Sequence, residues 1–516
     1  MDKQKEYAVD MQGITKRFGE VLANKNVNLQ LEKGEILAIL GENGSGKTTL
    51  MNMLSGIYYP DEGQIKIHGS AVTIKSPKEA FDHGIGMIHQ HFKLVDIMTA
   101  AENIVLGLNK GFKLNRKLLN KEVKELSEKY GFDINPEKKI YDMSVSEKQT
   151  VEILKVLYRG ADILILDEPT AVLTPQESDK LFAVMKNMSK HGKSIIIITH
   201  KLQEVLSVSD RVSILRKGEY IGTVITKNVN KEMLTEMMVG HAINLEINRP
   251  KVKRGNKLLK ITNLSCKTSE GVDGLKNINL SAYAGEVLGI AGIAGSGQKE
   301  LCESIAGLIE VSEGSIQIHT AKSGNVMAEI VGKAPEDIFE MGVSMAFVPE
   351  DRLGMGLVAS MGMVDNILVR YYRENKGIFI NRKKPELLSK ELVKELEIVT
   401  PDLTTPVKNL SGGNVQKILI GREISSAPEV LIVAYPVRGL DINSAYKIYD
   451  LINEQKQKGV AVIFVGEDLD ILMEISDRVA VMCGGKISGI VYPEDVTRED
   501  IGLMMIGESI DKKEAI

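Results

Sequence analysis

One stretch near the start of the sequence has the residue types and spacing of a phosphate-binding loop. Residues 41–48 read Gly-Glu-Asn-Gly-Ser-Gly-Lys-Thr and fit the pattern G-x-x-x-x-G-K-[ST] in full. Glycines in such a loop let backbone N–H groups face phosphate oxygens, and a following helix adds positive potential. We expect Lys47 to reach the β and γ phosphates of a nucleotide and Thr48 to ligate Mg²⁺. The nucleotide-binding residues predicted here are Gly41, Glu42, Asn43, Gly44, Ser45, Gly46, Lys47, Thr48 and Thr49.

A second motif supplies the carboxylates that hydrolysis of a nucleoside triphosphate needs. Residues 163–168 read Ile-Leu-Ile-Leu-Asp-Glu, which predicts a buried strand ending in Asp167 and Glu168. We assign Asp167 to the metal ion and Glu168 to the attacking water. An Asp-Glu pair after an apolar run says little alone, but combined with the phosphate loop it predicts a hydrolytic site.

The elements that would hold these motifs occur twice in the chain. Residues 25–29, Lys-Asn-Val-Asn-Leu, return as Lys-Asn-Ile-Asn-Leu at 276–280, a spacing of 251 (276 minus 25). Residues 209–212, Ser-Asp-Arg-Val, return unchanged at 476–479, a spacing of 267 (476 minus 209). Self-similarity at such a spacing predicts two domains of one fold in tandem.

Each half has the pattern of an α/β protein. Apolar β-branched runs such as residues 35–40 and 194–199 are followed by helix-like stretches, which is typical of buried parallel strands. Residues 94–157 are rich in Leu, Lys and Glu and predict a helical insert, a lobe of its own. The polar and basic stretch at 246–257 predicts a linker. The expected domains are therefore residues 1–245 and residues 258–516.

Composition excludes several classes of protein. The chain has 516 residues, 43% hydrophobic and 26% charged, with a net charge of -4, which indicates a globular protein of more than one domain. Its apolar runs are a few residues long, whereas a membrane span needs about 20, and no secretion signal is seen, so we expect a cytoplasmic protein. Its 3 cysteines are scattered without CxxC spacing, which predicts neither a disulfide framework nor a zinc site.

Two further segments resemble the signature of ATP-binding-cassette (ABC) proteins. Ser411-Gly412-Gly413-Asn414 stands in the second half, and Ser-Val-Ser-Glu at 144–147 stands at the matching place in the first. The resemblance covers nearly the whole chain. It implies an α/β fold of two tandem P-loop NTPase (ABC ATPase) domains, each with a RecA-like core, a helical subdomain and an antiparallel β subdomain.

The resemblance also implies further site residues, with ATP and Mg²⁺ as ligands. Gln90 would be the Q-loop glutamine, which bridges Mg²⁺ and the water, and His200 the switch histidine. Phe18 would stack on adenine, and residues 171–174 would form the D-loop. The predicted catalytic residues are therefore Glu168, His200 and Gln90.

The two halves differ where the chemistry should be. In the second half, Gln298 replaces Lys47, and Glu467 replaces His200. The remaining replacements are Ala434 for Asp167, Tyr435 for Glu168, Lys299 for Thr48, Glu350 for Gln90 and Ser269 for Phe18. Because each charge-assisted contact contributes about 1.5–3 kcal/mol, the second half should capture nucleotide poorly.

In the cassette family, two domains enclose ATP head to tail, each site pairing one phosphate loop with the other half's signature. The intact loop at 41–48 would then meet the intact signature, Ser411, Gly412, Gly413 and Asn414. The altered loop would meet the altered segment at 144–147. We therefore expect one hydrolytic ATP site and one degenerate site.

Tandem cassettes with Val-Pro-Glu-Asp-Arg at 348–352 resemble the ATPase subunits of bacterial importers for simple sugars and nucleosides. Residues 90–95 and 434–441 favour the nucleoside branch, although Tyr435 and Val437 depart from its commoner Gln and Thr. The resemblance implies two transmembrane permease subunits and an extracytoplasmic solute-binding (lipo)protein as partners. The chain would be peripheral, at the cytoplasmic face of the membrane, and would bind no nucleic acid.

The main alternative is a soluble tandem-cassette ATPase that acts on the ribosome or RNA as a translation factor. Such a protein usually has a long charged helical linker and two intact ATP sites, whereas this chain has a short linker and a negative net charge. A DNA-repair cassette would carry cysteine-rich zinc insertions, which 3 scattered cysteines exclude. A regulator or scaffold without a transport role is a further alternative.

Overall fold

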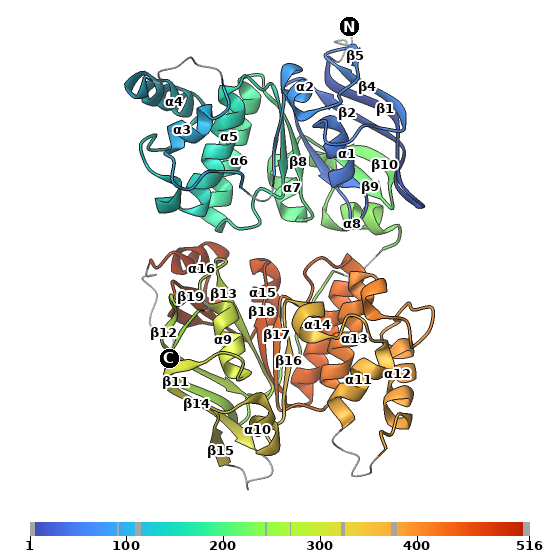
Figure 1. The fold of residues 1–516 in the computed structure, drawn as a ribbon, viewed down its shortest axis with the longest axis vertical. Coiled ribbons are helices and arrows are strands. Elements are labelled where there is room, and N and C mark those ends of the chain that lie inside the picture. Colours follow the sequence, from blue (N-terminus) through green and yellow to red (C-terminus); the bar gives the residue numbers. More distant parts are fainter. Residues whose placement is uncertain are drawn as a thin grey trace. The chain divides into compact units, whose positions relative to one another are not determined.

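The computed structural model describes residues 6–89, 92–108, 115–242, 245–268, 270–320, 326–372 and 379–508. The chain divides into two compact units, unit 1 (Met1–Asn244) and unit 2 (Leu245–Ile516) (Figure 1). Each unit combines a mainly parallel sheet, a smaller antiparallel portion and a cluster of helices, and each is described by itself below.

The core of unit 1 is a set of short parallel strands. β3 (Ile36–Leu40) pairs with β8 (Ser194–Ile198), followed in the sheet by β7 (Ile163–Asp167) and β6 (Ile85–Ile88). Every residue of β3 and β8 is buried, as expected for strands covered on both faces. Because the strands run in parallel, the segments that follow β3, β6, β7 and β8 meet at one edge of the sheet.

The antiparallel portion of unit 1 extends the same sheet. β1 (Tyr7–Phe18) pairs with both β2 (Val21–Glu32) and β4 (Glu62–Ile67), and β5 (Ser70–Val72) forms the edge. One bridge between Glu219 and Lys25 joins this portion to the core, giving a 10-stranded sheet. Unit 1 also contains α2 (Pro77–Asp82), α6 (Pro175–Lys190), α7 (Leu202–Val208), β9 (Arg211–Arg216), β10 (Glu219–Ile225) and α8 (Lys231–Val239).

Between β6 and β7 lies the predicted helical insert. It comprises α3 (Ala100–Val105), α4 (Arg116–Tyr130) and α5 (Val145–Tyr158), which gather on one side of unit 1 (Figure 1). α4 begins at Asn115, whose side chain accepts the Leu118 N–H, and ends at Gly131 in the left-handed conformation. Its buried face includes Leu119 and Val123, which explains the helical spacing seen in the sequence.

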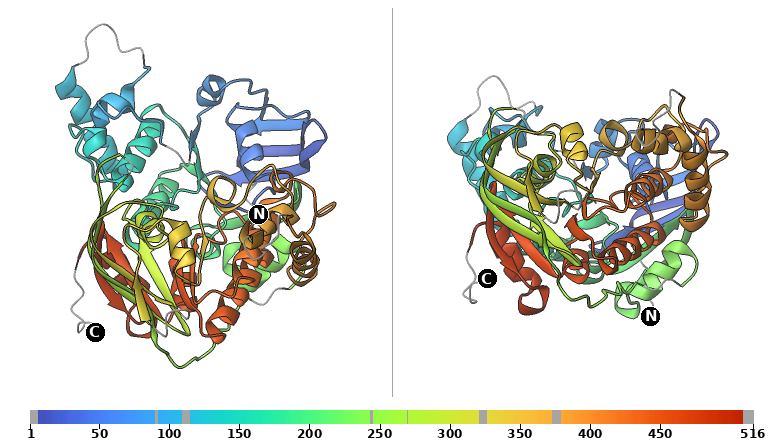
Figure 2. Two further views of the ribbon diagram at one scale, coloured as in Figure 1. Left: turned by 60° about the horizontal axis from the view of Figure 1, so that its bottom comes forward. Right: turned by 90° about the horizontal axis from the view of Figure 1, so that it is seen from below.

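Unit 2 repeats this arrangement, which confirms the predicted fold class. Its core sheet has the order β16-β17-β18-β13-β19-β20, the counterpart of β6-β7-β8-β3-β9-β10 in unit 1, while its antiparallel strands form a separate sheet, β12-β11-β14-β15 (Figures 1 and 2). Its strands are β11 (Lys257–Lys267), β12 (Asp273–Tyr283), β13 (Glu286–Gly292), β14 (Val311–Thr320), β15 (Val326–Glu329), β16 (Met345–Val348), β17 (Val430–Ala434), β18 (Ala461–Val465), β19 (Arg478–Cys483) and β20 (Lys486–Val491). Its helices are α9 (Gln298–Ile305), α10 (Pro335–Glu340), α11 (Met363–Tyr371), α12 (Lys383–Glu395), α13 (Gly412–Ile424), α14 (Ile442–Gln457), α15 (Leu469–Ile475) and α16 (Arg498–Met505).

The repeated motif Ser-Asp-Arg-Val has a structural role in both units. In unit 1, Arg211 Nε lies 2.5 Å from Glu35 Oε1, and Asp210 accepts the Ile36 N–H at 2.9 Å. In unit 2, Arg478 Nε lies 2.6 Å from Glu286 Oε1, and Asp477 makes the equivalent bond to a strand N–H. The motif therefore stabilises the pairing of β3 with β9 in unit 1 and of β13 with β19 in unit 2.

Residues of the predicted linker pack against unit 2. Ile247 is buried, and its N–H donates to Glu474 Oε1 at 3.0 Å. The Arg249 guanidinium donates to the carbonyl of Ser476, and Asn453 donates to the carbonyl of Asn248 at 3.3 Å. This segment is therefore held by polar contacts over part of its length.

No helix in the described part of the chain has the length and apolarity needed to cross a membrane. The longest of these helices, α6 and α14, have 16 residues each. Both are amphipathic, with buried residues such as Met185 and Ile448 on one face, as in helices that cover a sheet.

Candidate ATP site

The phosphate loop of unit 1 connects β3 to α1 (Lys47–Leu54). At some of its positions the backbone conformation and the close packing require glycine. Gly46, directly before α1, has φ +92°. A Cβ there would lie 2.4 Å from the Ala23 carbonyl oxygen and 2.5 Å from Asn24 Nδ2. Asn24 Nδ2 donates to the Gly46 carbonyl at 3.2 Å. The loop is therefore packed tightly against β2, which fixes the start of the helix.

Lys47 holds the loop in shape through its own side chain. Its Nζ donates to the carbonyls of Gly41 at 2.7 Å and Glu42 at 2.9 Å. Burial lowers the pKa of Lys47, and the charges of Glu168 and Asp167 oppose that shift. The ammonium group therefore lies near enough to the two predicted carboxylates for their charges to affect its pKa.

Asp167 and Glu168 lie at the end of β7, as predicted. Burial, with a further contribution from the charge of Glu168, raises the pKa of Asp167 to about 6. Glu168 has φ +49°, which is rare for a residue with a side chain, and its N–H donates to the Ile198 carbonyl at 2.9 Å. A buried carboxylate beside a second negative charge forms a site that favours a cation.

His200 meets Glu168 across the ends of β8 and β7. Nδ1 of His200 lies 2.9 Å from Oε1 of Glu168. Partial burial lowers the pKa of His200, but the hydrogen bond and the charge of Glu168 outweigh this effect, so the pKa is raised. The structure thus brings together Lys47, Glu168 and His200, which are far apart in the sequence.

Two of the other predicted residues of unit 1, Thr48 and Thr49, directly follow Lys47. Thr48 is exposed and Thr49 is half-buried at the start of α1. Gln90 lies outside the described residues; β6, which ends two residues before it, is next to β7 in the sheet. Ser269, the predicted counterpart of Phe18, also lies outside them.

Phe18 belongs to an aromatic group that motif reading did not find. Phe18 is 42% exposed at the end of β1, and its ring meets the Tyr58 ring edge to face, with centroids 5.1 Å apart. Lys16 Nζ lies 5.6 Å from the Phe18 centroid and 5.7 Å from that of Tyr59. The signal in the sequence is the pair Tyr58-Tyr59, a few residues after the helix that follows the phosphate loop.

The two signature segments form helix N-termini of different charge. In α5, Ser144 and Glu147 form a reciprocal cap, and the Glu147 carboxylate also pairs with Lys138 at 2.7 Å. In α13, Ser411 is exposed and caps the helix, with Asn414 Nδ2 donating to its Oγ at 2.8 Å. The first turn of α13 has no acidic residue. Its positive end is therefore available to an anion, whereas Glu147 neutralises that of α5.

Unit 2 keeps features of the site's backbone but has uncharged side chains at the positions of Lys47 and Glu168. Gln298 Nε2 donates to the Ile293 carbonyl at 3.1 Å, which corresponds to the Lys47 contact with Glu42 in unit 1. Tyr435 has φ +49° and its N–H donates to the Val465 carbonyl at 2.8 Å, as Glu168 does with Ile198. The turn after the strand therefore has the same φ and backbone hydrogen bond in both units, although its side chain differs.

An arginine takes part in the altered site of unit 2. Arg438 Nε lies 2.9 Å from Glu467 Oε1, and its Nη1 pairs with Glu350. Glu467 stands at the position of His200, and Glu350 at that of Gln90. The carbonyl of Arg438 also accepts a hydrogen bond from Arg352. Arg438 thus pairs with both carboxylates that the sequence comparison aligns with His200 and Gln90.

Comparison with known proteins decides the family. Residues 24–171 and 275–436 both match the family model described as ABC transporter. The chain belongs to this family. Because the ATP-binding proteins of ABC transporters are ATPases, the chain is an ATPase, and the two matched regions correspond to unit 1 and unit 2.

Three curated ABC transporter relatives extend over nearly the whole chain. It is 43% identical to the nucleoside import ATP-binding protein NupA of Lactococcus lactis, covering 98% of this chain and 99% of the relative. It is 43% identical to the guanosine import ATP-binding protein NupO of Bacillus subtilis, covering 99% of each. It is 37% identical to the ribose import ATP-binding protein RbsA of Clostridium perfringens, covering 96% of this chain and 98% of the relative.

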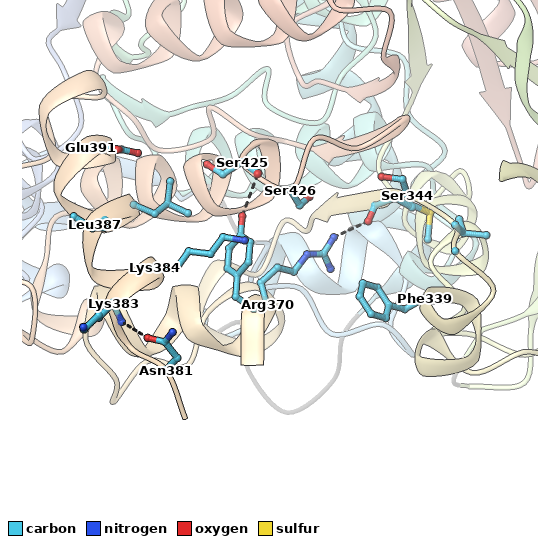
Figure 3. Close-up of a pocket in the computed structure, with 15 residues that line it drawn as sticks. Phe339, Ser344, Arg370, Asn381, Lys383, Lys384, Leu387, Glu391, Ser425 and Ser426 are labelled. Atoms are coloured by element: carbon cyan, nitrogen blue, oxygen red, sulfur yellow. Dashed lines mark hydrogen bonds between the residues drawn. The ribbon is translucent and has the colours of Figure 1, made fainter. Parts of the chain in front are cut away.

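This ABC ATPase also has a cavity of about 780 Å³ (Figure 3). It is in unit 2, where Phe339 of α10 and Arg370 of α11 border it. The guanidinium of Arg370 donates to the Met345 carbonyl at 2.7 Å. In unit 1, Phe81 has the equivalent place to Phe339 and is covered by the Arg159 guanidinium, 5.5 Å from its centroid. Ser426 replaces that arginine in unit 2 and lines the cavity.

Proposed function

We propose that the chain is the ATP-hydrolysing subunit of an importer and that hydrolysis takes place at one ATP site, the other being degenerate. The observation that carries this proposal is the contact between Glu168 and His200 beside Lys47. The equivalent backbone of unit 2 presents Tyr435, Glu467 and Gln298 instead. One framework therefore has the charges for hydrolysis, and the other lacks them.

In the competent site, each residue acts by position and charge rather than by covalent chemistry. Lys47 and the amides of residues 41–46 bind the phosphates, and Phe18 stacks on adenine. Glu168 orients or deprotonates the attacking water. His200 stabilises the charge on the γ-phosphate, and its contact with Glu168 links the two groups.

The residues around Lys47 fit a hydrated divalent cation. The elevated pKa of Asp167 reflects a buried carboxylate beside a second negative charge, which a cation relieves. Thr48 presents an exposed hydroxyl from the first turn of α1. Thr48, Asp167 and Gln90 would hold Mg²⁺, in part through water, and Mg²⁺ would neutralise charge on the β- and γ-phosphates.

The signature of unit 2 completes the competent site in this proposal. Ser411, Gly412, Gly413 and Asn414 would contact the γ-phosphate bound at the loop of unit 1. The charge of the helix ends supports this pairing, because the first turn of α13 is free of acidic residues and that of α5 carries Glu147. The degenerate site would combine the Gln298 loop with the Glu147 helix, and would lack both the lysine and a favourable helix end.

The cargo we propose is a nucleoside. The relatives named for nucleoside and guanosine import share 43% of residues with this chain, and the relative named for ribose import shares 37%. Two transmembrane permease subunits and an extracytoplasmic solute-binding (lipo)protein would complete the importer. The chain would be peripheral, at the cytoplasmic face of the membrane, and would act on no nucleic acid.

The test compares matched substitutions in the two units. In the importer assembled with its permeases, Glu168→Gln should abolish both ATP turnover and uptake of labelled nucleoside, while Tyr435→Phe should leave both near wild type. Equal effects of the two substitutions would refute the asymmetry. Uptake of labelled ribose in preference to nucleosides would refute the cargo, and co-purification with ribosomes in place of permeases would refute the importer itself.

A further inference from the structure

Glu204, in the first turn of α7, is part of no motif above, yet its carboxylate joins the two segments that carry Glu168 and His200. Thr170 Oγ1 donates to its Oε1 at 2.5 Å, and Thr199 Oγ1 donates to its Oε2 at 3.2 Å. We propose that Glu204 is a positioning residue for ATP hydrolysis, which fixes the Glu168 segment to the His200 segment through these threonines. The proposal rests on the proposed roles of Glu168 and His200.

Glu204 can influence the site because the two threonines that it binds lie next to the predicted catalytic residues in the sequence. Thr170 follows Glu168 by two residues, and Thr199 directly precedes His200. Thr170 is 1% exposed, Thr199 0% and Glu204 5%. A hydrogen bond at such depth does not compete with water, and a buried carboxylate is stable only when its oxygens are paired. The two hydrogen bonds of Glu204 are therefore buried, and they lie close to the proposed catalytic residues in the sequence.

Lys201 completes the network from the same helix end. Its Nζ lies 3.2 Å from Glu204 Oε1, and its N–H donates to Thr199 Oγ1 at 3.1 Å. Lys201 Nζ also lies 3.5 Å from the Thr170 carbonyl. The Glu204 carboxylate thus accepts hydrogen bonds from the hydroxyls of Thr170 and Thr199 and forms an ion pair with Lys201.

Comparison with unit 2 separates positioning from folding. There the four network residues are all replaced, by Val437, Gly466, Asp468 and Ile471. Val437 and Ile471 pack against a hydrophobic cluster of unit 2. Nevertheless, the turn at Tyr435 keeps the φ of Glu168 and the same backbone hydrogen bond. The turn therefore forms without the network, and the network occurs only where the catalytic pair occurs.

The rate of hydrolysis should depend on how precisely Glu204 holds the Glu168 and His200 segments in place. Misplacement of a reacting group by about 1 Å can lower the rate about 100-fold without loss of binding. Loosening the bridge would change the distance between Glu168 and His200 but would leave Lys47 and the phosphate loop untouched. The expected signature is therefore a fall in kcat with little change in KM.

The experiment measures steady-state ATP hydrolysis and thermal unfolding of the full chain. Glu204→Gln keeps the size of the side chain but leaves one oxygen to accept, so kcat should fall about tenfold or more while KM for ATP stays within about twofold. The control is Thr170→Val combined with Glu204→Ile, the pair of residue types that unit 2 already uses. Because the pair removes the buried Thr170 hydroxyl, which in Glu204→Ile alone would face an apolar side chain, its thermal midpoint should exceed that of Glu204→Ile.

The two readouts distinguish positioning from stability. The proposal expects the double variant to regain thermal stability but not kcat. It is overturned if kcat recovers together with the thermal midpoint, or if Glu204→Gln keeps kcat within about twofold of wild type. Glu168→Gln is measured alongside; if that variant still turns over, the assignment of the catalytic site fails, whatever the result for Glu204.

Discussion

Oε1 of Glu168 lies 2.9 Å from Nδ1 of His200, and this contact raises the pKa of the histidine despite its partial burial. The pair comes from two neighbouring parallel strands, β7 and β8, whose carboxyl ends meet at one edge of the sheet. In the proposed site, this contact would link the charge of His200 to Glu168, the residue proposed to act on the attacking water.

The first prediction concerns the titration of His200. Its pKa should lie above 6.5 in the wild type and should fall in Glu168→Gln, because the substitution removes the charge that stabilises the imidazolium. NMR of protein labelled at the rings of its 8 histidines measures this, with the His200 signal assigned by its loss in His200→Gln. A wild-type value at or below 6.5 would contradict the prediction.

The same raised pKa predicts a pH dependence of stability. The folded state binds the His200 proton more tightly than the unfolded state, so the contribution is full below the unfolded pKa of about 6.5. It is lost as the pH rises through the raised folded pKa. The difference in unfolding free energy between wild type and His200→Gln should therefore be larger at about pH 6 than at about pH 8.5.

The second prediction concerns Lys47. Lys47→Gln copies the residue that unit 2 carries at Gln298, whose amide reaches the equivalent loop carbonyl, so the loop should keep its shape. Loss of a charge-assisted contact of about 1.5–3 kcal/mol should weaken ATP binding at least tenfold. Titration with a fluorescent ATP analogue measures the affinity. Gln298→Lys is the matched control and should not create a second hydrolytic site, because Ala434 and Tyr435 remain.

The third prediction compares two glycines of the phosphate loop. Gly44 and Gly46 both have positive φ, 79° and 92°. A Cβ at Gly46 would lie 2.4 Å from a backbone oxygen, whereas a Cβ at Gly44 would meet nothing within 4 Å. Gly44→Ala should therefore cost about 1–2 kcal/mol from its conformation alone. Gly46→Ala should cost about 1–3 kcal/mol more because its neighbours must move. Chemical denaturation without nucleotide measures both, and equal losses would contradict the packing described here.

The fourth prediction contrasts two arginine ion pairs of unit 2. The Arg478 and Glu286 side chains are 8% and 2% exposed, so Arg478→Gln leaves a buried carboxylate and should cost about 3–5 kcal/mol. The Arg438 side chain is 51% exposed, and Arg438→Gln should cost less than about 1 kcal/mol. Unfolding free energies of the full chain decide this. A larger loss for Arg438→Gln would mean that its ion pairs hold the fold of unit 2 together.

Much of the fold was predictable because its determinants are local. The strand Ile36–Leu40 is wholly apolar, and α4 shows a helical spacing between a polar cap at Asn115 and Gly131. The tandem architecture followed from the repeat of short motifs such as Ser-Asp-Arg-Val. The reason for that repeat was not predictable, because Arg211 meets Glu35 only when β9 lies beside β3.

Several parts of the site needed the structure because they depend on contacts between distant segments. Tyr58 reaches Phe18, 40 residues away (58 minus 18), only through the packing of the antiparallel portion. Glu204 bears on Glu168 only because β7 and β8 are neighbours. Arg438 pairs with Glu350 across 88 positions of sequence, and no pattern of residues predicts that contact.

The family, the phosphate loop and the residues that differ between the halves can all be recognised without a structure. Each depends on short motifs, because a loop that binds phosphate and a strand that ends in carboxylates are each built from a few consecutive residues. The contacts of Glu168 with His200, and of Glu204 with both threonines, are visible only in the folded chain. Parallel strands bring their carboxyl ends together whatever the length of chain between them, so these distances depend on strand order and not on sequence spacing.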